Sequence, residues 1–417
     1  MGRAILTLAN GVRVVIDPMA QLKSAAVGVW VRAGATDESD DENGVAHLLE
    51  HMAFKGTGRR SAKDIAEAIE SVGGHLNAAT SYQTTGYYAR TLSADVGCAF
   101  DILSDIILDP RLEEAELAKE KEVVIQEIGE ARDTPDDVLF ENIQSLTYRD
   151  QALGRPILGG ENDVRSHSAA TLRRFMDRHY TAENMIVAVS GGVDEDEIEA
   201  LAKQYFGSMT PQQAPRDSIC NRVTSGFHHD PRDLEQTHIA FAVPAVGVRD
   251  DDYFAMRLTA EILGGGMSSR LFQTVREKHG LAYSVYAYAD AYDDVGTIGV
   301  YAGTDADKAL QAVDISLTEI AGMARGVTAP ELDRARAMLK SSLLMGLESP
   351  INRAERSAGQ LFTFGRLISE DEICASLDAV TPGDISRCAA SLIESAKKSL
   401  AVVGPAEFDK LKARLNL

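Results

Sequence analysis

The strongest constraint on the fold of this 417-residue chain is an internal repeat. The segment Gly86–Ala89 resembles Gly299–Ala302, and Ala188–Gly191 resembles Ala401–Gly404, so both pairs are 213 residues apart (299 − 86 and 401 − 188). Recurrence at one offset indicates one architecture used twice. We therefore predict two homologous α/β domains, residues 1–206 and 228–417, joined by a linker at residues 207–227.

Local patterns in the first half predict both strands and helices. Residues 12–16, 25–31 and 85–90 are rich in β-branched and aromatic residues, which is typical of strands. Residues 61–72 have apolar residues on one helical face, and Ser61 with Asp64 approximates a capping box. The predicted linker contains Pro211 and Pro215 among small polar residues.

Composition limits the classes of function. With 42 basic and 63 acidic residues the net charge is −21, which argues against nucleic-acid binding. No segment approaches the ~20 consecutive apolar residues of a membrane span, and the first residues lack an extended apolar run, so we expect a cytoplasmic protein. The four cysteines lack metal-ligand spacing, which predicts free or buried thiols in a reducing compartment: Cys98, Cys220, Cys374 and Cys388.

A His-x-x-Glu-His segment carries the clearest chemical signal. On a helix, His47 and His51 lie one turn apart and can share a metal ion, while Glu50 leans over the same place. This order is the inverzincin pattern. The alternative is an ordinary amphipathic helix on which the two histidines lie together by chance. However, the residues predicted to face the core lie on a different arc of the helix from His47, Glu50 and His51: Val45, Leu48, Leu49 and Met52. Asn43 is the predicted N-cap of this helix.

A third metal ligand has to come from another segment, and the predicted helix from Glu113 to Glu130 is the best source. Glu120 and Glu127 lie two turns apart on one face of that helix. The alternative, a solvated acidic helix, explains most of its other glutamates.

Residues 44–57 (GVAHLLEHMAFKGT) closely resemble the zinc segment of the pitrilysin/insulinase family of inverted zinc peptidases. Within the family, the chain is most similar to the mitochondrial processing peptidase β-subunit and its single-gene bacterial relatives. Residues 73–78 (GGHLNA), 120–127 and 276–283 (REKHGLAY) extend the resemblance over essentially the whole chain. It implies two domains, each an antiparallel-rich sheet packed with helices, that form half of a clamshell chamber.

The resemblance also implies roles for individual residues. One Zn²⁺ per chain would be bound by His47, His51 and Glu127, with Glu120 supporting the site and Glu50 as the general base. Applying the 213-residue offset to the metal site gives Ala260, Leu263, Gly264 and Lys340, so the second domain is expected to bind no zinc. The resemblance also implies three groups of substrate contacts. An edge strand that binds substrate by β-augmentation contains Asn77, Ala78, Ala79 and Thr80. Two acidic residues, Asp137 and Glu141, contact a substrate arginine, and Arg276 with Tyr283 clamps the substrate.

These features predict a zinc metalloendopeptidase that cleaves unfolded peptides, basic ones included, inside a chamber closed by a homodimer. A heterodimer with a related subunit stays open. The alternative function is a structural or substrate-binding subunit without its own activity. Relatives of that kind typically lack an intact zinc motif, whereas this chain retains His47, Glu50 and His51.

Overall fold

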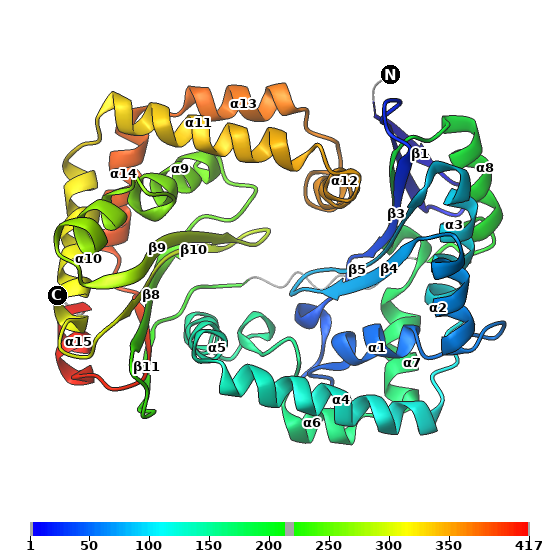
Figure 1. Cartoon of the computed structure of the whole chain (residues 1–417), viewed down its shortest axis with the longest axis horizontal. Helices are drawn as coiled ribbons and strands as arrows, with labels where there is room; N and C mark the ends of the chain where they lie inside the picture. The colour runs from blue at the N-terminus through cyan, green and yellow to red at the C-terminus, as the bar shows by residue number, and fades with distance from the viewer. Residues whose placement is uncertain (1–2, 213–220, 416–417) are drawn as a thin grey trace. The chain divides into compact units, whose positions relative to one another are not determined.

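The computed structural model describes residues 3–212 and 221–415. Cys220 and the centre of the predicted linker lie outside these ranges, and the other three cysteines are free and partly buried. The chain forms two compact units, each built around its own sheet (Figure 1). The first comprises Met1–Ile128, Arg155–Ser218 and Met345–Leu367, and the second comprises Gly129–Gly154, Ile219–Leu344 and Ile368–Leu417.

The first unit has a six-stranded sheet of order β1-β2-β6-β3-β5-β4. Its strands are β1 (Ala4–Thr7), β2 (Arg13–Pro18), β3 (Ser24–Val31), β4 (His75–Thr80), β5 (Thr85–Leu92) and β6 (Met185–Gly191). Only the β2–β6 pair is parallel, and the other pairs are antiparallel. The strands predicted at residues 12–16, 25–31 and 85–90 are confirmed as β2, β3 and β5. Strand β4 lies at the edge of the sheet.

Both faces of this sheet are covered. Alternate residues of a strand point to opposite faces, so each strand contributes side chains to both contacts. One face packs against a large apolar core with helices α1 (Val45–Ala53), α2 (Ala62–Ser71), α3 (Val96–Leu108), α4 (Glu114–Asp133), α7 (Ala169–His179) and α8 (Glu195–Phe206). The short helix α6 (Glu161–Ser166) adds Val164 to that core. The predicted helix at residues 61–72 is confirmed as α2, including the capping box of Ser61 and Asp64.

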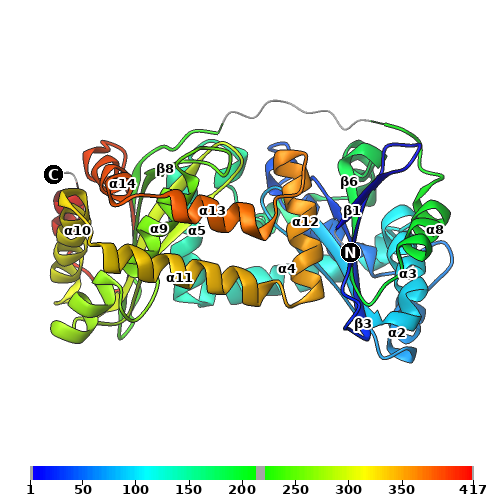
Figure 2. The same ribbon diagram turned by 90° about the horizontal axis from the view of Figure 1, so that it is seen from above.

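The opposite face packs against one helix, α12 (Pro350–Phe364), which Figure 2 shows across the first sheet from α2, α3 and α8. The apolar contact joins alternate strand residues to one stripe of α12: Val15, Trp30, Ile186 and Ala188 with Ala354, Ala358, Leu361 and Phe362. Arg13 and Arg32 each lie over the Phe362 ring, at 5.7 and 5.8 Å from its centroid.

The second unit repeats this plan. Its sheet order is β7-β11-β8-β10-β9, from β7 (Gly226–Asp230), β8 (Thr237–Ala245), β9 (Ala282–Ala291), β10 (Gly296–Thr304) and β11 (Ser399–Val403), and β7 and β11 are parallel as β2 and β6 are. Strands β3 and β8 begin 213 residues apart, at Ser24 and Thr237. One face is covered by α9 (Tyr253–Gly264), α10 (Ala309–Arg325), α11 (Ala329–Gly346), α13 (Glu370–Ala379), α14 (Pro382–Glu394) and α15 (Phe408–Leu415). The mixed α/β fold with two antiparallel-rich sheets is thus confirmed.

The two halves of the sequence exchange one helix each. Helix α5 (Pro135–Thr147) comes from the first half but packs through Leu139 and Ile143 on the second sheet, on the face opposite the main core. Its counterpart in the repeat, α12, comes from the second half and packs on the first sheet. The compact units therefore differ from a division of the chain at the predicted linker. None of the described helices is long and apolar enough to cross a membrane.

Candidate metal centre

Helix α1 carries the His-x-x-Glu-His segment above the core of the first unit. Its buried residues fix the helix on the core: Val45, Ala46, Leu48, Leu49, Met52 and Ala53. The predicted N-cap at Asn43 is wrong, because the cap is Gly44, with a left-handed backbone (φ 87°). A β-carbon at Gly44 would lie 2.7 Å from the carbonyl oxygen of Leu158. The Asn43 side chain instead donates hydrogen bonds to the Pro156 carbonyl at 3.0 Å and to Glu38 Oε2 at 3.2 Å.

The Glu38 carboxylate takes the place of a capping side chain. It accepts hydrogen bonds from the backbone N–H groups of Gly44 (3.0 Å) and Ala46 (2.8 Å), which have no partner inside the helix. Burial raises the pKa of Glu38 to about 7, and the N–H donors oppose that rise. Glu38 lies six residues before the cap, outside the usual capping spacing, so no sequence pattern pointed to it.

Helix α4 brings Glu120 and Glu127 to α1, as the sequence predicts. The Glu127 Oε2 atom lies 3.7 Å from His47 Nε2 and 3.5 Å from His51 Nε2, and the two imidazole ring centroids are 4.6 Å apart. One ligand atom from each residue lies within 4.8 Å of the other two. No other such group of three metal-binding side chains occurs among residues 3–212 and 221–415, so none is found at the repeat counterparts in the second unit.

Glu120 orients His51. Its Oε2 atom lies 3.2 Å from His51 Nδ1, and its Oε1 atom lies 2.8 Å from Lys55 Nζ. Glu120 is 6% exposed, and Lys55 forms an ion pair with it. A proton on Nδ1 that bonds to Glu120 leaves the Nε2 lone pair of His51 directed at Glu127 and any ion there. Lys55 was missed from the sequence, although its position one turn after His51 on the same helix was an available signal.

The donor set fits zinc, which binds imidazole nitrogen and carboxylate oxygen in catalytic sites. Burial, followed by the nearby charge of His51, lowers the pKa of His47 to about 4, so its imidazole is neutral at pH 7 and can act as a ligand. His47 Nδ1 is buried and has no hydrogen-bond partner within the described parts of the chain. Glu127 is partly exposed, at 38% of its side chain, so the group is open to solvent on one side.

Glu50 lies beside this group and contacts strand β4. Thr80 Oγ1 donates a hydrogen bond of 2.5 Å to Glu50 Oε2. Burial raises the pKa of Glu50, and the Thr80 hydrogen bond opposes the rise. Two hydrogen-bonded tyrosines, Tyr87 and Tyr180 (2.8 Å between hydroxyls), lie close enough for the Glu50 charge to raise the pKa of both, after the larger effect of burial.

The other residues predicted on β4 lie on both of its faces. Ala78 packs towards the core that also contains α1, while Asn77 and Ala79 point to the face covered by α12. Asn77 Oδ1 accepts a hydrogen bond from the Ala78 N–H at 2.9 Å. The contact of Thr80 with Glu50 was not foreseen, since a side-chain contact between distant segments leaves no local sequence pattern.

Four predicted residues belong to the second unit. The Arg276 guanidinium lies between two aromatic rings, 4.4 Å from the centroid of Tyr283 and 4.6 Å from that of Phe272. Tyr283 is 74% exposed. Asp137 and Glu141 are exposed on α5.

Known proteins are similar to the chain in sequence and in fold. Residues 13–161 match the insulinase family (peptidase family M16), and residues 166–339 match the peptidase M16 inactive domain. An uncharacterized zinc protease of Rickettsia felis is 38% identical over 402 residues (96% of this chain and 97% of the relative). The uncharacterized zinc protease YmxG of Bacillus subtilis is 35% identical over 404 residues, covering 96% and 97%.

Solved structures show the same fold. The crystal structure of a protease from Helicobacter pylori matches with a TM-score of 0.90 at 22% identity, covering 97% of this chain and 99% of that one. A peptidase M16 inactive domain from Pseudomonas fluorescens also matches with a TM-score of 0.90, at 20% identity, covering 97% and 98%. Because both family models match this chain and the sequence relatives match along nearly its whole length, the chain belongs to the pitrilysin/insulinase family, peptidase family M16.

Proposed function

We propose that the protein is a zinc metalloendopeptidase whose metal ligands are His47, His51 and Glu127. The observation that carries this proposal is the convergence of three ligand atoms within 4.8 Å beside a fourth, non-ligand carboxylate, Glu50. The names of the zinc protease relatives agree with the choice of metal. The hydrogen bond that the Glu120 carboxylate accepts from His51 Nδ1 supports a site held in one geometry.

A zinc ion bound there supplies Lewis acidity that activates water and polarises the peptide carbonyl. Glu50 accepts the proton of the attacking water and passes it to the nitrogen of the leaving amine. Burial favours the protonated form that Glu50 takes between these two transfers, while the Thr80 hydroxyl stabilises the ionised form that starts the cycle. The contact with Thr80 also restricts where the Glu50 carboxylate lies.

The substrate is an extended peptide that adds to the free edge of β4, residues Asn77 to Thr80. Edge strands bind peptides through main-chain hydrogen bonds, which favours unfolded segments over particular sequences. The position of β4 at the end of the sheet and the contact of Thr80 with Glu50 support this assignment. In the free protein the Ala78 N–H donates a hydrogen bond to the Asn77 side chain. The Asn77 side chain therefore has to move before that N–H can bond to a peptide.

Further assignments belong to the same proposal. Residues 1–206 supply the chemistry, and residues 228–417 contribute substrate contacts through Arg276 and Tyr283. Asp137 and Glu141 contact basic substrate residues; equal cleavage of matched arginine and glutamate peptides would contradict that role. The homodimer, the single zinc per chain and the cytoplasmic location stay predictions.

The direct test is digestion of a varied peptide library by purified protein, with products identified by mass spectrometry. We expect internal cleavage that stops when a chelator removes the metal and returns when zinc is added. A protein that binds zinc but cleaves no peptide would instead be a substrate-binding or structural subunit.

A further inference from the structure

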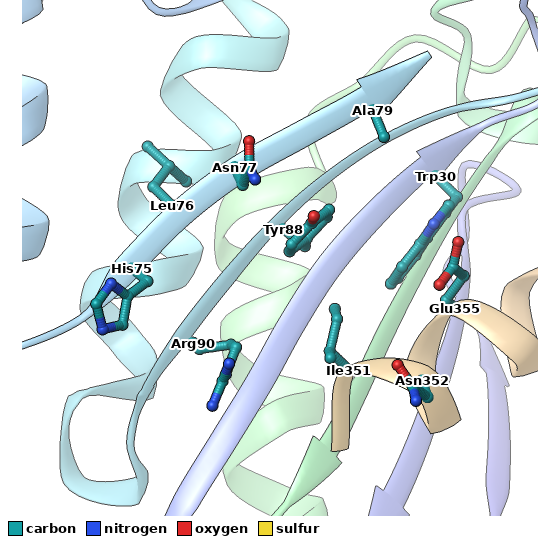
Figure 3. Close-up of a pocket in the computed structure, with 10 residues that line it drawn as sticks. All are labelled: Trp30, His75, Leu76, Asn77, Ala79, Tyr88, Arg90, Ile351, Asn352 and Glu355. Carbon is teal, nitrogen blue, oxygen red and sulfur yellow. The ribbon is translucent and has the colours of Figure 1, made fainter. Parts of the chain in front are cut away.

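A cavity of about 450 Å³ lies in the first unit, on the face of the sheet opposite the metal-binding group. Its walls come from β3, β4, β5 and α12. Figure 3 shows Trp30 and Tyr88 on the strands and Ile351 and Glu355 on the helix around the same space, with Ala79 near the sheet edge. None of these residues has a role in the chemistry proposed above, apart from the place of Ala79 on the edge strand.

The register of three strands creates this opening. Gly86 of β5 pairs with Trp30 of β3 on one side and with Ala79 of β4 on the other. A β-carbon at Gly86 would lie 2.6 Å from the Trp30 indole nitrogen, and one at Gly28 would lie 2.2 Å from the indole ring. The indole therefore lies flat over two glycines. No large side chain stands between it and the edge of the sheet.

The second unit has an aromatic residue at the edge-strand position that corresponds to Ala79. Gly299, which follows Gly86 by 213 residues, pairs with Tyr288 on β9 in the way that Gly86 pairs with Ala79. The Tyr288 ring covers Gly299, since a β-carbon there would lie 2.1 Å from the ring. Tyr288 also meets Phe140 of α5 edge to face, with centroids 5.6 Å apart. An aromatic ring thus lies over the glycine in both units, but it comes from different strands: Trp30 of β3 covers Gly86, whereas Tyr288 of β9 covers Gly299, whose partner on β8 is Ala242. Only in the first unit is the residue at the edge-strand position, Ala79, small.

The occupant follows from the alternation of side chains along β4. Thr80 faces Glu50, whereas its neighbour Ala79 faces the cavity. A peptide paired with this edge alternates in the same way, so a residue adjacent to one that faces Glu50 directs its side chain to the cavity. Trp30, Tyr88 and Ile351 offer aromatic and aliphatic surface there, which suits the body of an apolar or aromatic side chain. The lining also contains five polar side chains: His75, Asn77, Arg90, Asn352 and Glu355.

We infer that this cavity is a specificity pocket for one large apolar or aromatic side chain of the bound peptide. The inference rests on the proposed peptidase function, because it requires a peptide on β4. The pocket would give the enzyme a sequence preference at one position of the peptide, whereas the edge strand alone contacts only the peptide main chain.

Trp30 makes the pocket directly observable, because it is the only tryptophan of the chain. The probe is a set of matched peptides without tryptophan that carry p-iodophenylalanine at successive positions, mixed with zinc-loaded Glu50→Gln protein. Iodine quenches indole fluorescence on contact. We expect quenching to peak at one position and to be weak at its two neighbours. Binding with no position-dependent quenching would overturn the pocket.

Cleavage preference gives the second readout. For the wild type, kcat/KM with phenylalanine at the peak position should exceed kcat/KM with alanine there by about 10-fold or more. Ala79→Phe fills the cavity from the strand and Ile351→Trp narrows it from α12, so each should bring that ratio towards 1. The matched control, Ala66→Phe at an exposed position of α2, should keep the wild-type ratio.

The two proposals fail in different ways. Absence of peptide cleavage by the wild type would contradict the peptidase function. Cleavage with an unchanged phenylalanine-to-alanine ratio in both filled variants would contradict the pocket alone. If either variant is inactive, the same p-iodophenylalanine titration in the Glu50→Gln background decides, since a filled pocket should lose the positional quenching.

Discussion

Glu120 is the residue through which His51 and Lys55 are connected. Its two oxygens contact different partners, at 3.2 Å from His51 Nδ1 and 2.8 Å from Lys55 Nζ. When the second ring N–H of a metal-binding histidine donates a hydrogen bond to a carboxylate, the histidine is held in one tautomer and is a more basic ligand. At the residue scale the site therefore depends on side chains outside the His-x-x-Glu-His segment, and on Thr80 as well, which bonds to Glu50.

Glu120→Gln should reduce zinc affinity by about 10- to 100-fold, because the variant removes the charge that supports His51. The measurement is competition for zinc against a chelator of known affinity. Glu122→Gln is the matched control, since Glu122 lies on the same helix with 61% of its side chain exposed. Equal affinity in the two variants would show that Glu120 does not support the metal site.

Thr80→Val should move the acid limb of the kcat/KM profile to higher pH. The Thr80 hydroxyl stabilises ionised Glu50 and so lowers its pKa; without the donor the pKa rises further, and more base is lost at a given acid pH. At neutral pH we expect kcat/KM to fall by up to about 10-fold. Thr84→Val, in the turn that follows β4, is the control. An unchanged acid limb in Thr80→Val would separate Thr80 from the general base.

Helices α5 and α12 are the elements that the sequence could not place. Each has a clear amphipathic pattern, but such a pattern shows only that one face is buried, not which sheet buries it. The strands and the helices α1 and α4 are predictable from the sequence because their signals are local and periodic. The exchange of helices, the Glu38 cap and the contact of Thr80 with Glu50 depend on tertiary structure, which no short window of sequence contains.

The exchange predicts that the first half of the chain is not independently stable. Residues 1–212 lack α12, so Val15, Trp30, Ile186 and Ala188 would be exposed to water. We expect this fragment to aggregate or to unfold without cooperativity, and to become folded when it is produced together with residues 213–417. Trp30 fluorescence reports the difference, because burial under α12 shifts its emission to shorter wavelength. A monomeric 1–212 fragment with cooperative unfolding and the emission of the full chain would contradict this.

At the scale of the whole molecule, a duplicated architecture carries one metal-binding group. The sheets share strand order and direction, yet among the described residues only the first unit brings two histidines and a glutamate together. The second unit instead exposes Tyr283 beside Arg276. We propose that this pair gives the second unit its role in substrate binding.

We predict that the chain acts as a homodimer in which Arg276 and Tyr283 serve the metal centre of the partner. Glu50→Gln protein and Arg276→Ala/Tyr283→Phe protein should each be poorly active, and mixing them under conditions of subunit exchange should restore part of the activity. The mixed dimer contains one site with both Glu50 and an intact arginine–tyrosine pair. Verified exchange without recovered activity would show that the pair acts within its own chain or serves no catalytic role.

We propose that Glu50 transfers protons while His47, His51 and Glu127 hold zinc. The most direct measurement is the zinc content and the peptide turnover of Glu50→Gln beside His51→Ala and the wild type. We expect about one zinc per chain in Glu50→Gln with turnover reduced by about 10²- to 10⁴-fold, and weakened zinc binding in His51→Ala. A Glu50→Gln protein that loses its zinc at neutral pH, or that cleaves peptides at the wild-type rate, would contradict this proposal.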